Sequence, residues 1–576
     1  MSVHNTEIAE AFEEIANLLE IRGENPFRVR AYRNAARTIS DLGEELSDRV
    51  ERGEEIVGIP GIGKELALKI GQMVITGRIT QLEELRQAMP PGLLDMLRIP
   101  GLGPKRVKTL YHDLNIHDVN QLAEAARAGK VRALPGMGEK LETSILKAIE
   151  TRRVEGKRFL RATAARYAES LLEHLRTVRG VKQISLAGSY RRARETIGDL
   201  DILIEAADST AAMEAFTTYD EIQEILAKGE TKSSIVLRAG IQVDLRVVPA
   251  ESFGAALQYF TGSKEHNIAV RKIAQAKGLK VSEYGVFRGE ESIAGRTEKD
   301  VYAALDLACP PPEIRENRGE VELAASGKFP KLVEASDIRG DLHNHSTASD
   351  GANTIEEMAT AAQELGYEYL AICDHSKRLT VASGLDEKRL AKQIKEIDKL
   401  NESFKNFRLL KGTECDILED GSLDLDDTIL AELDLVVVSV HSKFNLPRDQ
   451  QTERVLRALD NKYTSILAHP TGRLILEREP YDIDIARVIE HAKQRGCFLE
   501  LNANPMRLDL NDVHCQMAKK AGVLISIDVD GHHVRDLSNL TFGIGQARRG
   551  WLEKKDVLNT RPLKELLKLL NAVRNG

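Results

Sequence analysis

Residues 184–205, ISLAGSYRRARETIGDLDILIE, decide the fold of the central part of this chain. The pattern predicts an apolar strand, a turn at Gly188 and Ser189, a short basic helical turn, and a second strand that carries Asp199 and Asp201. Side chains at positions i and i+2 of a strand point to the same face, so we expect the two carboxylates to lie side by side while Leu200 packs behind them. Two like charges that close favour a divalent cation between them.

A third carboxylate, Asp244, lies in the alternating run IQVDLRVV at residues 241–248. The alternation predicts a neighbouring strand with its apolar side chains on one face and Asp244 on the other. Three carboxylates on one sheet face can hold two Mg2+ ions, which suits nucleotidyl transfer: one ion activates a hydroxyl and the other stabilises the leaving pyrophosphate. Backbone N–H groups at Gly188 and Ser189, with Arg192 as a charged clamp, would bind phosphates. The alternative is solvated acids at a sheet edge.

A short repeat occurs three times before this stretch. GIPGIGK (58–64), RIPGLGP (98–104) and ALPGMGE (133–139) share an apolar-Pro-Gly-apolar-Gly core, and a helical pattern follows each copy. Such turns allow close approach of another molecule, and the helix start that follows presents free N–H groups. This helix-hairpin-helix pattern is typical of proteins that bind DNA backbone phosphates without reading bases. The third copy also fits a purely structural turn. The expected DNA-binding positions are Gly61, Gly63, Gly101, Gly103, Gly136 and Gly138.

The composition is that of a globular protein with several domains. A chain of 576 residues predicts three to five domains, and 42% hydrophobic with 30% charged residues is ordinary for such proteins. The apolar runs are too short for a membrane span and the N-terminus does not resemble a signal peptide, so we expect no membrane association. Five scattered cysteines without a C-x-x-C pair favour reduced thiols in the cytoplasm. The net charge of -8 is a sum that hides local basic stretches.

The segment YFTGSKEHNIAVR, residues 259–271, adds two adjacent aromatic side chains before a Thr-Gly bend. These could stack against a sugar and base; the alternative is two core aromatics followed by a solvated helix. Together with the hairpin repeats and the three carboxylates, the segment resembles the X family of DNA polymerases (polymerase beta-like) over residues 1–318.

The resemblance implies a set of roles at the polymerase site. The Mg2+ ligands and catalytic residues would be Asp199, Asp201 and Asp244. The incoming triphosphate would be bound by Gly188, Ser189 and Arg192. The sugar would be crowded, and ribonucleotides disfavoured, by Tyr259, Phe260 and Gly262. The minor-groove side of the nascent base pair would be lined by Asn267 and Arg271.

Lys69 falls where the family carries its deoxyribose-phosphate lyase nucleophile. Two departures put that activity in question: Glu65 stands one helical turn earlier, where a basic residue is usual, and Phe27 replaces a histidine, although Tyr32 is retained. A phosphate contact is the alternative role for Lys69.

Three consecutive prolines from Pro310 begin a predicted linker, and a second chemical centre follows it. Most of its histidines and acids come just after apolar stretches that helical patterns separate, which predicts a parallel β/α barrel with its site at the carboxyl ends of the strands. Mixed imidazole and carboxylate ligands favour Zn2+, Mn2+ or Fe2+ over Mg2+ or Ca2+. The expected ligands are His343, His345, Asp350, His375, Glu414, His441, His469, Asp530 and His532.

These motifs resemble the PHP (polymerase and histidinol phosphatase) family over residues 341–545, with all nine ligand positions filled. The resemblance implies a phosphoesterase on a sevenfold β/α barrel that uses up to three Mn2+ or Zn2+ ions.

We therefore expect a multidomain α+β and α/β protein. The predicted parts are a helical DNA-binding domain with the first hairpin (1–85), a second helical DNA-binding domain with the other hairpins (86–150), a nucleotidyltransferase palm (151–250), a thumb that contacts the nascent pair (251–318), a linker (319–340) and a (β/α)7 PHP barrel (341–576).

The predicted function is gap-filling DNA synthesis in repair by a bacterial X-family polymerase, with 3'-5' exonuclease, 3'-phosphatase or abasic-site endonuclease activity in the barrel. The expected partners are gapped or primer-template DNA and dNTPs, and we expect a cytoplasmic monomer. One alternative is an inert polymerase-like scaffold whose PHP domain is the active enzyme. Another is a nucleotidyltransferase with a non-DNA acceptor, which the three hairpin repeats disfavour.

Overall fold

The computed structural model describes residues 3, 5–40, 46–51, 53–59, 61–97, 99, 101–155, 158–206 and 208–575. The chain divides into two compact units, Met1–Lys157 and Arg158–Gly576, and each is considered by itself. Within the described residues, none of the helices combines the length and apolar character that a membrane crossing needs.

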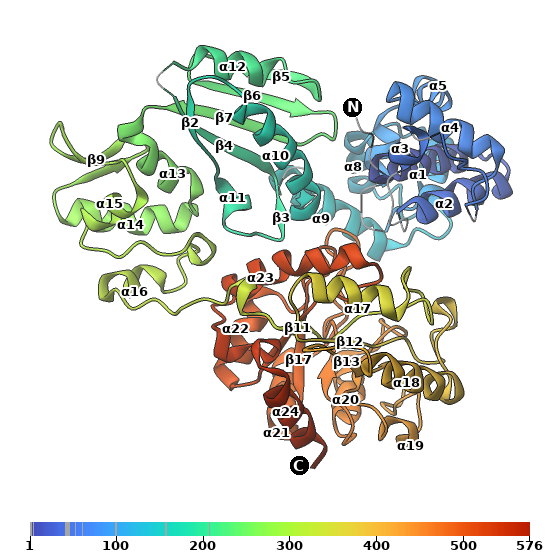
Figure 1. Cartoon of the computed structure of the whole chain (residues 1–576). Helices are drawn as coiled ribbons and strands as arrows, with labels where there is room; N and C mark the ends of the chain where they lie inside the picture. Colours follow the sequence, from blue (N-terminus) through green and yellow to red (C-terminus); the bar gives the residue numbers. More distant parts are fainter. Residues whose placement is uncertain are drawn as a thin grey trace. The chain divides into compact units, whose positions relative to one another are not determined.

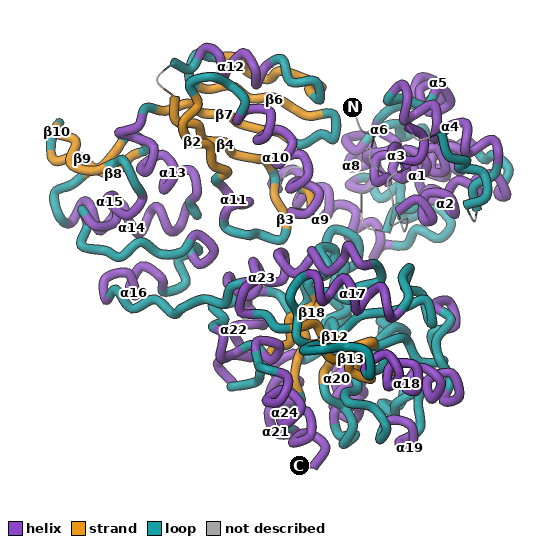
Figure 2. Tube along the Cα trace, viewed as in Figure 1, coloured by secondary structure: helices purple, strands orange, loops and turns teal. Residues whose placement is uncertain are grey.

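The first unit is built from helices, as the purple tube in Figure 2 shows. One continuous apolar core joins them, in which the rings of Phe12 and Tyr32 meet edge to face at 5.5 Å. The helices are α1 (Asn5–Arg22), α2 (Pro26–Ser40), α3 (Leu46–Glu51), α4 (Lys64–Thr76), α5 (Thr80–Ala88), α6 (Gly92–Leu97), α7 (Pro104–Leu114), α8 (Val119–Arg127) and α9 (Glu139–Glu155).

The three predicted hairpin turns each lead directly into a helix: α4, α7 and α9. The first glycine of each turn is in the left-handed region, with φ of 81° at Gly61, 86° at Gly101 and 75° at Gly136, where other residues are strained. Three other positions of the repeat motifs, Pro60, Arg98 and Pro100, lie outside the described residues.

The palm is a five-stranded sheet in the order β2-β4-β7-β6-β5. Strands β4 and β7 run parallel, whereas the other neighbours are antiparallel. Helices α10 (Arg161–Arg176) and α12 (Thr210–Thr217) pack on the apolar face of the sheet (Figure 1). The strands are β2 (Val181–Leu186), β4 (Asp199–Ala206), β5 (Ile222–Lys228), β6 (Lys232–Leu237) and β7 (Gln242–Val248); the short pair β1 (Phe159–Leu160) and β3 (Thr196–Ile197) lies beside it.

The thumb follows as helices around a small antiparallel sheet, β8 (Lys280–Ser282), β9 (Gly285–Arg288) and β10 (Glu291–Ala294). Its helical elements are η1 (Ala250–Ser252), α13 (Phe253–Thr261), α14 (Lys264–Ala276), α15 (Glu298–Ala303), η2 (Pro312–Ile314) and α16 (Glu320–Ser326). Residues 319–340, predicted as a linker, thus contain α16, whose Ala324 packs in the thumb core. The thumb therefore extends past residue 318, into the segment that was predicted as a linker.

Glu298 binds two arginines inside the thumb and palm. It accepts hydrogen bonds from Arg191 and Arg315, and the side chain of Arg315 is only 1% exposed. Burial alone would raise the pKa of Glu298, but the two arginines outweigh it and lower that pKa to about 2. The ionised carboxylate therefore stabilises the fold above its usual pKa near 4.5, and this contribution is lost as the pH falls from 4.5 towards 2.

We expect Glu298→Gln to lower the free energy of unfolding by about 3 kcal/mol at pH 7, because it leaves the buried charge of Arg315 without its carboxylate. Urea unfolding followed by circular dichroism measures the change, with Glu291→Gln, an exposed position on β10, as the control. A difference below about 1 kcal/mol, the size of an exposed pair, would contradict the role given to this ion pair.

The C-terminal half of the second unit is a barrel of parallel strands with helices outside it (Figure 1). Its strands are β11 (Gly340–Asp341), β12 (Tyr369–Ile372), β13 (Arg408–Lys411), β14 (Glu414–Asp416), β15 (Val437–Ser439), β16 (Ile466–Leu467), β17 (Phe498–Asn502) and β18 (Ile525–Asp528). Strand β13 pairs with β12, and β14, which directly follows β13 in the chain, pairs with β15. Strands β13 and β14 therefore occupy one strand position of the barrel, which makes the barrel sevenfold.

Two isolated bridges close the barrel between its two sheets: His375 pairs with Glu414, and Asn344 pairs with Gly531. Both bridges lie at predicted ligand positions or beside them. The surrounding helices are η3 (Ala335–Asp337), α17 (Ile355–Glu364), η4 (Thr380–Ala382), α18 (Glu387–Asn401), α19 (Asp427–Leu430), α20 (Arg448–Leu459), α21 (Ile485–Arg495), α22 (Asp512–Ala521), η5 (Val534–Asn539), α23 (Leu540–Arg549), η6 (Lys554–Asp556), η7 (Leu558–Thr560) and α24 (Leu563–Asn575).

Candidate active sites

The three predicted polymerase carboxylates lie on adjoining strands of the palm. Asp199 and Asp201 stand at the start of β4, and Asp201 is the register partner of Asp244 on β7. Leu200 and Val243, which alternate with them, are fully buried, so the carboxylates belong to the opposite face of the sheet.

Mutual repulsion and burial act on these carboxyls. Burial raises the pKa of Asp201 to about 7, and the charges of Asp199 and Asp244 add to this shift. Burial and Asp244 also raise the pKa of Asp199. A divalent cation would relieve this repulsion, so the donor set fits a metal ion.

A pH dependence of metal binding follows from the raised pKa of Asp201. Because only the ionised carboxylate can bind a cation, we expect the affinity of the palm for a divalent cation to be full well above pH 7 and to fall below it. We expect the Mg2+ concentration for half-maximal primer extension to rise by up to about tenfold between pH 7 and pH 6. Titrations with Mg2+ at pH 6, 7 and 8 measure it; a constant midpoint would contradict the proton competition.

The predicted triphosphate turn lies against these carboxylates. Gly188 has a φ of 58°, and a Cβ atom placed there would lie 2.2 Å from Oδ2 of Asp201, so glycine is required on both counts. Gly188 begins the short helix α11 (Gly188–Arg191), in which Ser189 is half-buried. Arg192 follows the helix, donates from Nε to Glu316 over 3.1 Å, and donates from Nη1 to the backbone oxygen of Thr261.

The aromatic pair ends helix α13. The rings of Tyr259 and Phe260 meet edge to face at 5.1 Å, and the guanidinium of Arg246 lies 4.2 Å from the Phe260 ring. Gly262 caps the helix with a φ of 67°. Both rings are half-buried, and Phe260 packs against the small core cluster of Leu203, Phe253 and Ala256.

The two residues predicted at the minor groove differ in environment. Asn267 is buried: its Nδ2 donates to the backbone oxygen of Tyr259 over 2.7 Å, and its Oδ1 accepts from Gln258 over 2.8 Å. Arg271 lies one helical turn further along α14 and is exposed. In this conformation Asn267 therefore positions the aromatic pair, whereas Arg271 is accessible to a ligand.

The hairpin turns differ at the helix starts that follow them. Gly63 and Gly103 are the N-caps of α4 and α7, and a Cβ atom at either would meet nothing within 4 Å in the part of the chain that the structure describes. At the third turn, Gly138 is equally open, but α9 begins with Glu139 and Glu142, which pair with Arg132 over 3.0 and 2.6 Å. Carboxylates at this helix start would repel a phosphate.

Lys69 lies in a cavity of about 890 Å³ lined by residues of α1, α2, α4 and α5 and by Glu24 of the loop between α1 and α2. Its ammonium pairs with Glu65 over 2.6 Å and lies 5.8 Å from the ring of Tyr32. Phe27, by contrast, is 74% exposed. Glu65 thus occupies the amine that a lyase reaction would need, which disfavours a nucleophilic role for Lys69.

The nine predicted barrel ligands come together at the carboxyl ends of the strands. Three overlapping groups have ligand atoms within 4.8 Å of one another: His345, Asp350, His375 and His532; His343, His345, Glu414 and Asp530; His375, Glu414 and His441. His469 joins them through Nε2, which lies 2.9 Å from Glu414 Oε1.

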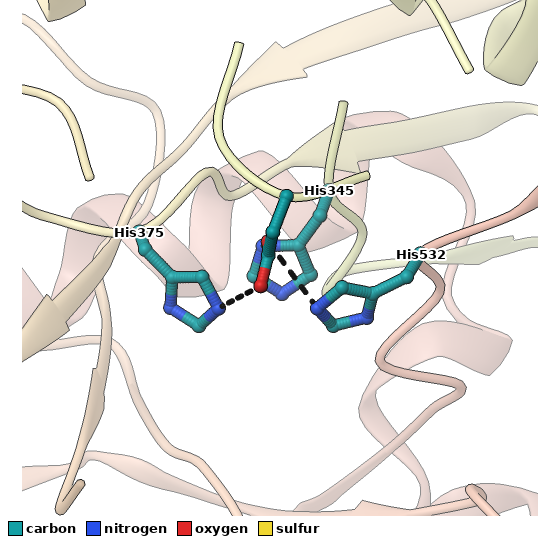
Figure 3. A group of neighbouring side chains, drawn as sticks. His345, His375 and His532 are labelled. Carbon is teal, nitrogen blue, oxygen red and sulfur yellow. Dashed lines mark ion pairs between the residues drawn. The ribbon is translucent and has the colours of Figure 1, made fainter. Parts of the chain in front are cut away.

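One of these groups is drawn in Figure 3, where the rings of His345, His375 and His532 surround one carboxylate. Asp350 pairs with His375 over 3.5 Å and with His532 over 3.4 Å. The rings of His345 and His532 are stacked, with centroids 4.2 Å apart. So many imidazoles would repel one another if protonated, and a cation held by their lone pairs avoids that cost.

Glu414 is the common member of the cluster. It is 1% exposed, and its two oxygens lie between 2.8 and 3.6 Å from five histidines: His343, His345, His375, His441 and His469. Among the described residues, Glu414 Oε2 finds no hydrogen-bond partner, and the same holds for one ring nitrogen each of His343, His345 and His375. Buried polar atoms without partners are costly, so this arrangement fits metal ions bridged by a carboxylate.

Comparisons with known proteins match the domains that carry these two sites. Family models match along the chain: a helix-hairpin-helix domain at residues 3–79, a SAM-like helix-hairpin-helix tandem at 93–151, the DNA polymerase beta palm at 158–253, the DNA polymerase beta thumb at 256–316 and the PHP domain at 341–504. The DNA polymerase/3'-5' exonuclease PolX of Bacillus subtilis (strain 168) is 43% identical over 568 residues, which cover 98% of this chain and 99% of that protein.

The chain belongs to the X-family DNA polymerases that carry a C-terminal PHP domain. Two other relatives cover parts of it. A probable phosphatase of Thermoanaerobacter sp. (strain X514) is 30% identical over 40% of this chain and 94% of its own length. DNA polymerase lambda of Rattus norvegicus is 26% identical over 54% of this chain and 56% of its own length. The polymerase and PHP families are both metal-dependent. The fold class predicted from the sequence is confirmed.

Three residues that contact the barrel ligands were not predicted from the sequence. Glu500 lies 2.6 Å from Nδ1 of His343, and Asp416 lies 2.8 Å from Nδ1 of His441, so each carboxylate orients a ligand ring. Arg507 points its Nε at Asp530 over 3.5 Å and brings a positive charge to the edge of the cluster. The signal for Glu500 was an acid inside the apolar strand FLELN, a residue type that is rarely buried without a partner.

Proposed function

We propose that the chain fills short gaps in DNA by nucleotidyl transfer at the palm and shortens DNA 3' ends by hydrolysis in the barrel. The observation that supports this most is the presence of both complete ligand sets in one chain that matches a polymerase/exonuclease over 98% of its length.

At the palm, Asp199, Asp201 and Asp244 would hold Mg2+. Bound divalent ions would activate the primer 3'-hydroxyl and stabilise the leaving pyrophosphate. Residues of the chain supply the rest: the Gly188-Ser189 turn and Arg192 would bind the triphosphate of a dNTP. The deoxyribose would pack against the aromatic pair of α13, leaving little space for a 2'-hydroxyl.

At the barrel, the nine ligands would hold up to three Mn2+ or Zn2+ ions, which would supply a hydroxide at neutral pH. Glu500 and Asp416 would keep the ring nitrogens of His343 and His441 aimed at the ions. Arg507 would bind a non-bridging oxygen of the scissile phosphate. We propose 3'-5' exonuclease as the main reaction, with 3'-phosphatase or abasic-site cleavage as related phosphoester hydrolyses at the same centre.

The helical unit would hold the DNA by its backbone. The open helix starts at Gly63 and Gly103 are the proposed phosphate grips, with Gly61 and Gly101 shaping the turns. Gly136 and Gly138 receive weaker support, because two carboxylates, Glu139 and Glu142, sit at that helix start, against one, Glu65, at α4 and none at α7. A DNA-directed enzyme works where the genome lies, so we propose a cytoplasmic protein that acts as a monomer.

Gly103→Val should weaken binding to a one-nucleotide-gapped duplex by about tenfold. The slope of the logarithm of the binding constant against the logarithm of the salt concentration should fall by the amount that about one phosphate contact contributes. Among the described residues, a Cβ atom at Gly103 meets nothing within 4 Å, so we expect the valine side chain to stand where a phosphate would approach the α7 helix start. Gly138→Val is the matched control, since its site is equally open but already carries two carboxylates. Fluorescence anisotropy at several salt concentrations measures both; equal losses in the two variants would contradict the assignment of the first two grips.

A further inference from the structure

Helix α23 of the barrel packs against the turn that carries the proposed triphosphate ligands of the palm. The contacts come from positions spaced as one helical face: Phe542, Gly545, Gln546 and Arg549. The guanidinium of Arg161 in the palm lies 5.6 Å from the Phe542 ring, and a Cβ atom at Gly545 would lie 3.0 Å from Cβ of Ala193. The glycine therefore lets the helix approach the turn closely.

The same turn is held at its end by a second contact. Glu195 binds the guanidinium of Arg473 through both of its oxygens, over 2.8 and 3.2 Å, and accepts a hydrogen bond from Gln546. Bidentate carboxylate contacts of this kind fix geometry as well as charge. The barrel thus contacts the turn directly after Arg192, at Ala193 and Glu195.

Arg549 is the contact that reaches Arg192 itself. Its side chain is 3% exposed, and Nη1 donates to the backbone oxygen of Arg192 over 2.8 Å. Nη1 also donates to Oε1 of Glu316 over 2.8 Å, the same oxygen that accepts from Nε of Arg192. Glu316 is therefore shared between the guanidinium that would bind triphosphate and a guanidinium supplied by the barrel.

This sharing has an energetic consequence for nucleotide binding. Nε of Arg192 is held by Glu316 and Nη1 by the backbone oxygen of Thr261. A triphosphate that draws this guanidinium away would leave Glu316 without Arg192, and a largely buried carboxylate without a cation is strongly destabilising. With Arg549 in place, Glu316 keeps a partner at 2.8 Å after Arg192 leaves, whereas Arg194 lies 4.0 Å away.

We propose that Arg549 of the PHP domain is a positioning residue for the polymerase site, which frees Arg192 to bind the triphosphate by keeping Glu316 neutralised. The polymerase site is thereby completed by the barrel. The proposal rests on the proposed role of Arg192 as a triphosphate ligand.

Steady-state extension of a one-nucleotide-gapped duplex tests it in the full-length protein. Arg549→Gln should raise the KM for the complementary dNTP by about tenfold, a usual size for coupling between sites, with a smaller change in kcat. Adding Glu316→Gln to that variant should restore most of the KM, because Arg192 is then no longer held by a carboxylate. A merely structural role for Arg549 gives no such rescue.

Arg548→Gln is the matched control, because Arg548 is the neighbouring residue and pairs with Glu313 over 2.7 Å. It should leave the KM unchanged, and 3'-end shortening should be normal in all these variants. An unchanged KM in folded Arg549→Gln protein, or no rescue in the double variant, overturns the inference. Arg192→Gln tests the triphosphate role of Arg192 separately from the positioning role of Arg549. If this variant does not raise the KM for the dNTP, the proposed triphosphate role is wrong, independently of Arg549.

Discussion

Asp201→Asn should reduce primer extension by at least about 1,000-fold while 3'-end shortening stays within about twofold of the wild type. Asp201 is the central carboxylate of the palm: it pairs in register with Asp244, follows Asp199 on the same face, and lies against Gly188. The substitution keeps the shape and removes the charge. Metal-ion stabilisation of a transition state is worth several kcal/mol, and each factor of ten is about 1.4 kcal/mol.

The measurement is single-turnover incorporation of one complementary dNTP into a gapped duplex in excess Mg2+. Gln242→Glu is a useful comparison, because Gln242 donates to Asp244 over 3.1 Å and lies beside the same carboxylates. It adds a charge near the site without removing a proposed ligand, so extension should fall far less than in Asp201→Asn. Extension within tenfold of the wild type in Asp201→Asn would refute the assigned metal site.

Glu414→Gln should have the opposite selectivity: shortening falls by at least about 1,000-fold and extension is retained. Glu414 contacts five of the histidines and belongs to two of the three ligand groups, so its loss removes the carboxylate that those groups share. An amide at this position cannot bridge cations as a carboxylate does. Elemental analysis of the purified protein should show a smaller metal content as well.

Glu419→Gln serves as the control for Glu414→Gln, because Glu419 is an exposed acid of the barrel that pairs with Lys443 at the surface. It should leave both shortening and metal content unchanged. Full shortening by Glu414→Gln protein would mean that the barrel cluster is not the nuclease.

The sequence predicted the parts of the two sites that depend on local pattern. Alternation in residues 241–248 placed Asp244 on the face opposite the buried valines, as observed in β7. Histidines that directly follow apolar stretches were predicted to meet at one end of a barrel, and they do. The first pattern depends on the two-residue period of a strand, and the second depends on the common carboxyl end of parallel strands. Both can therefore be recognised from the sequence alone.

Contacts between residues far apart in the chain were not predictable in this way. Arg549 binds the backbone of Arg192 across 357 positions, and no periodicity links the two. The same is true of Glu500 behind His343, whose burial becomes meaningful only when the barrel closes. Helix α16 was not predicted, because the prolines and glycines around it suggested a linker. In the structure its Ala324 packs in the thumb core.

The central claim is that one chain carries two separable active sites. A 5'-labelled primer on a one-nucleotide gap, with and without dNTPs, tests it for the wild type, Asp201→Asn, Glu414→Gln and the double variant. The account predicts that Asp201→Asn loses only extension, Glu414→Gln loses only shortening, and the double variant leaves the primer unchanged. Loss of both reactions in either single variant, in protein that is folded and binds the duplex normally, would contradict it.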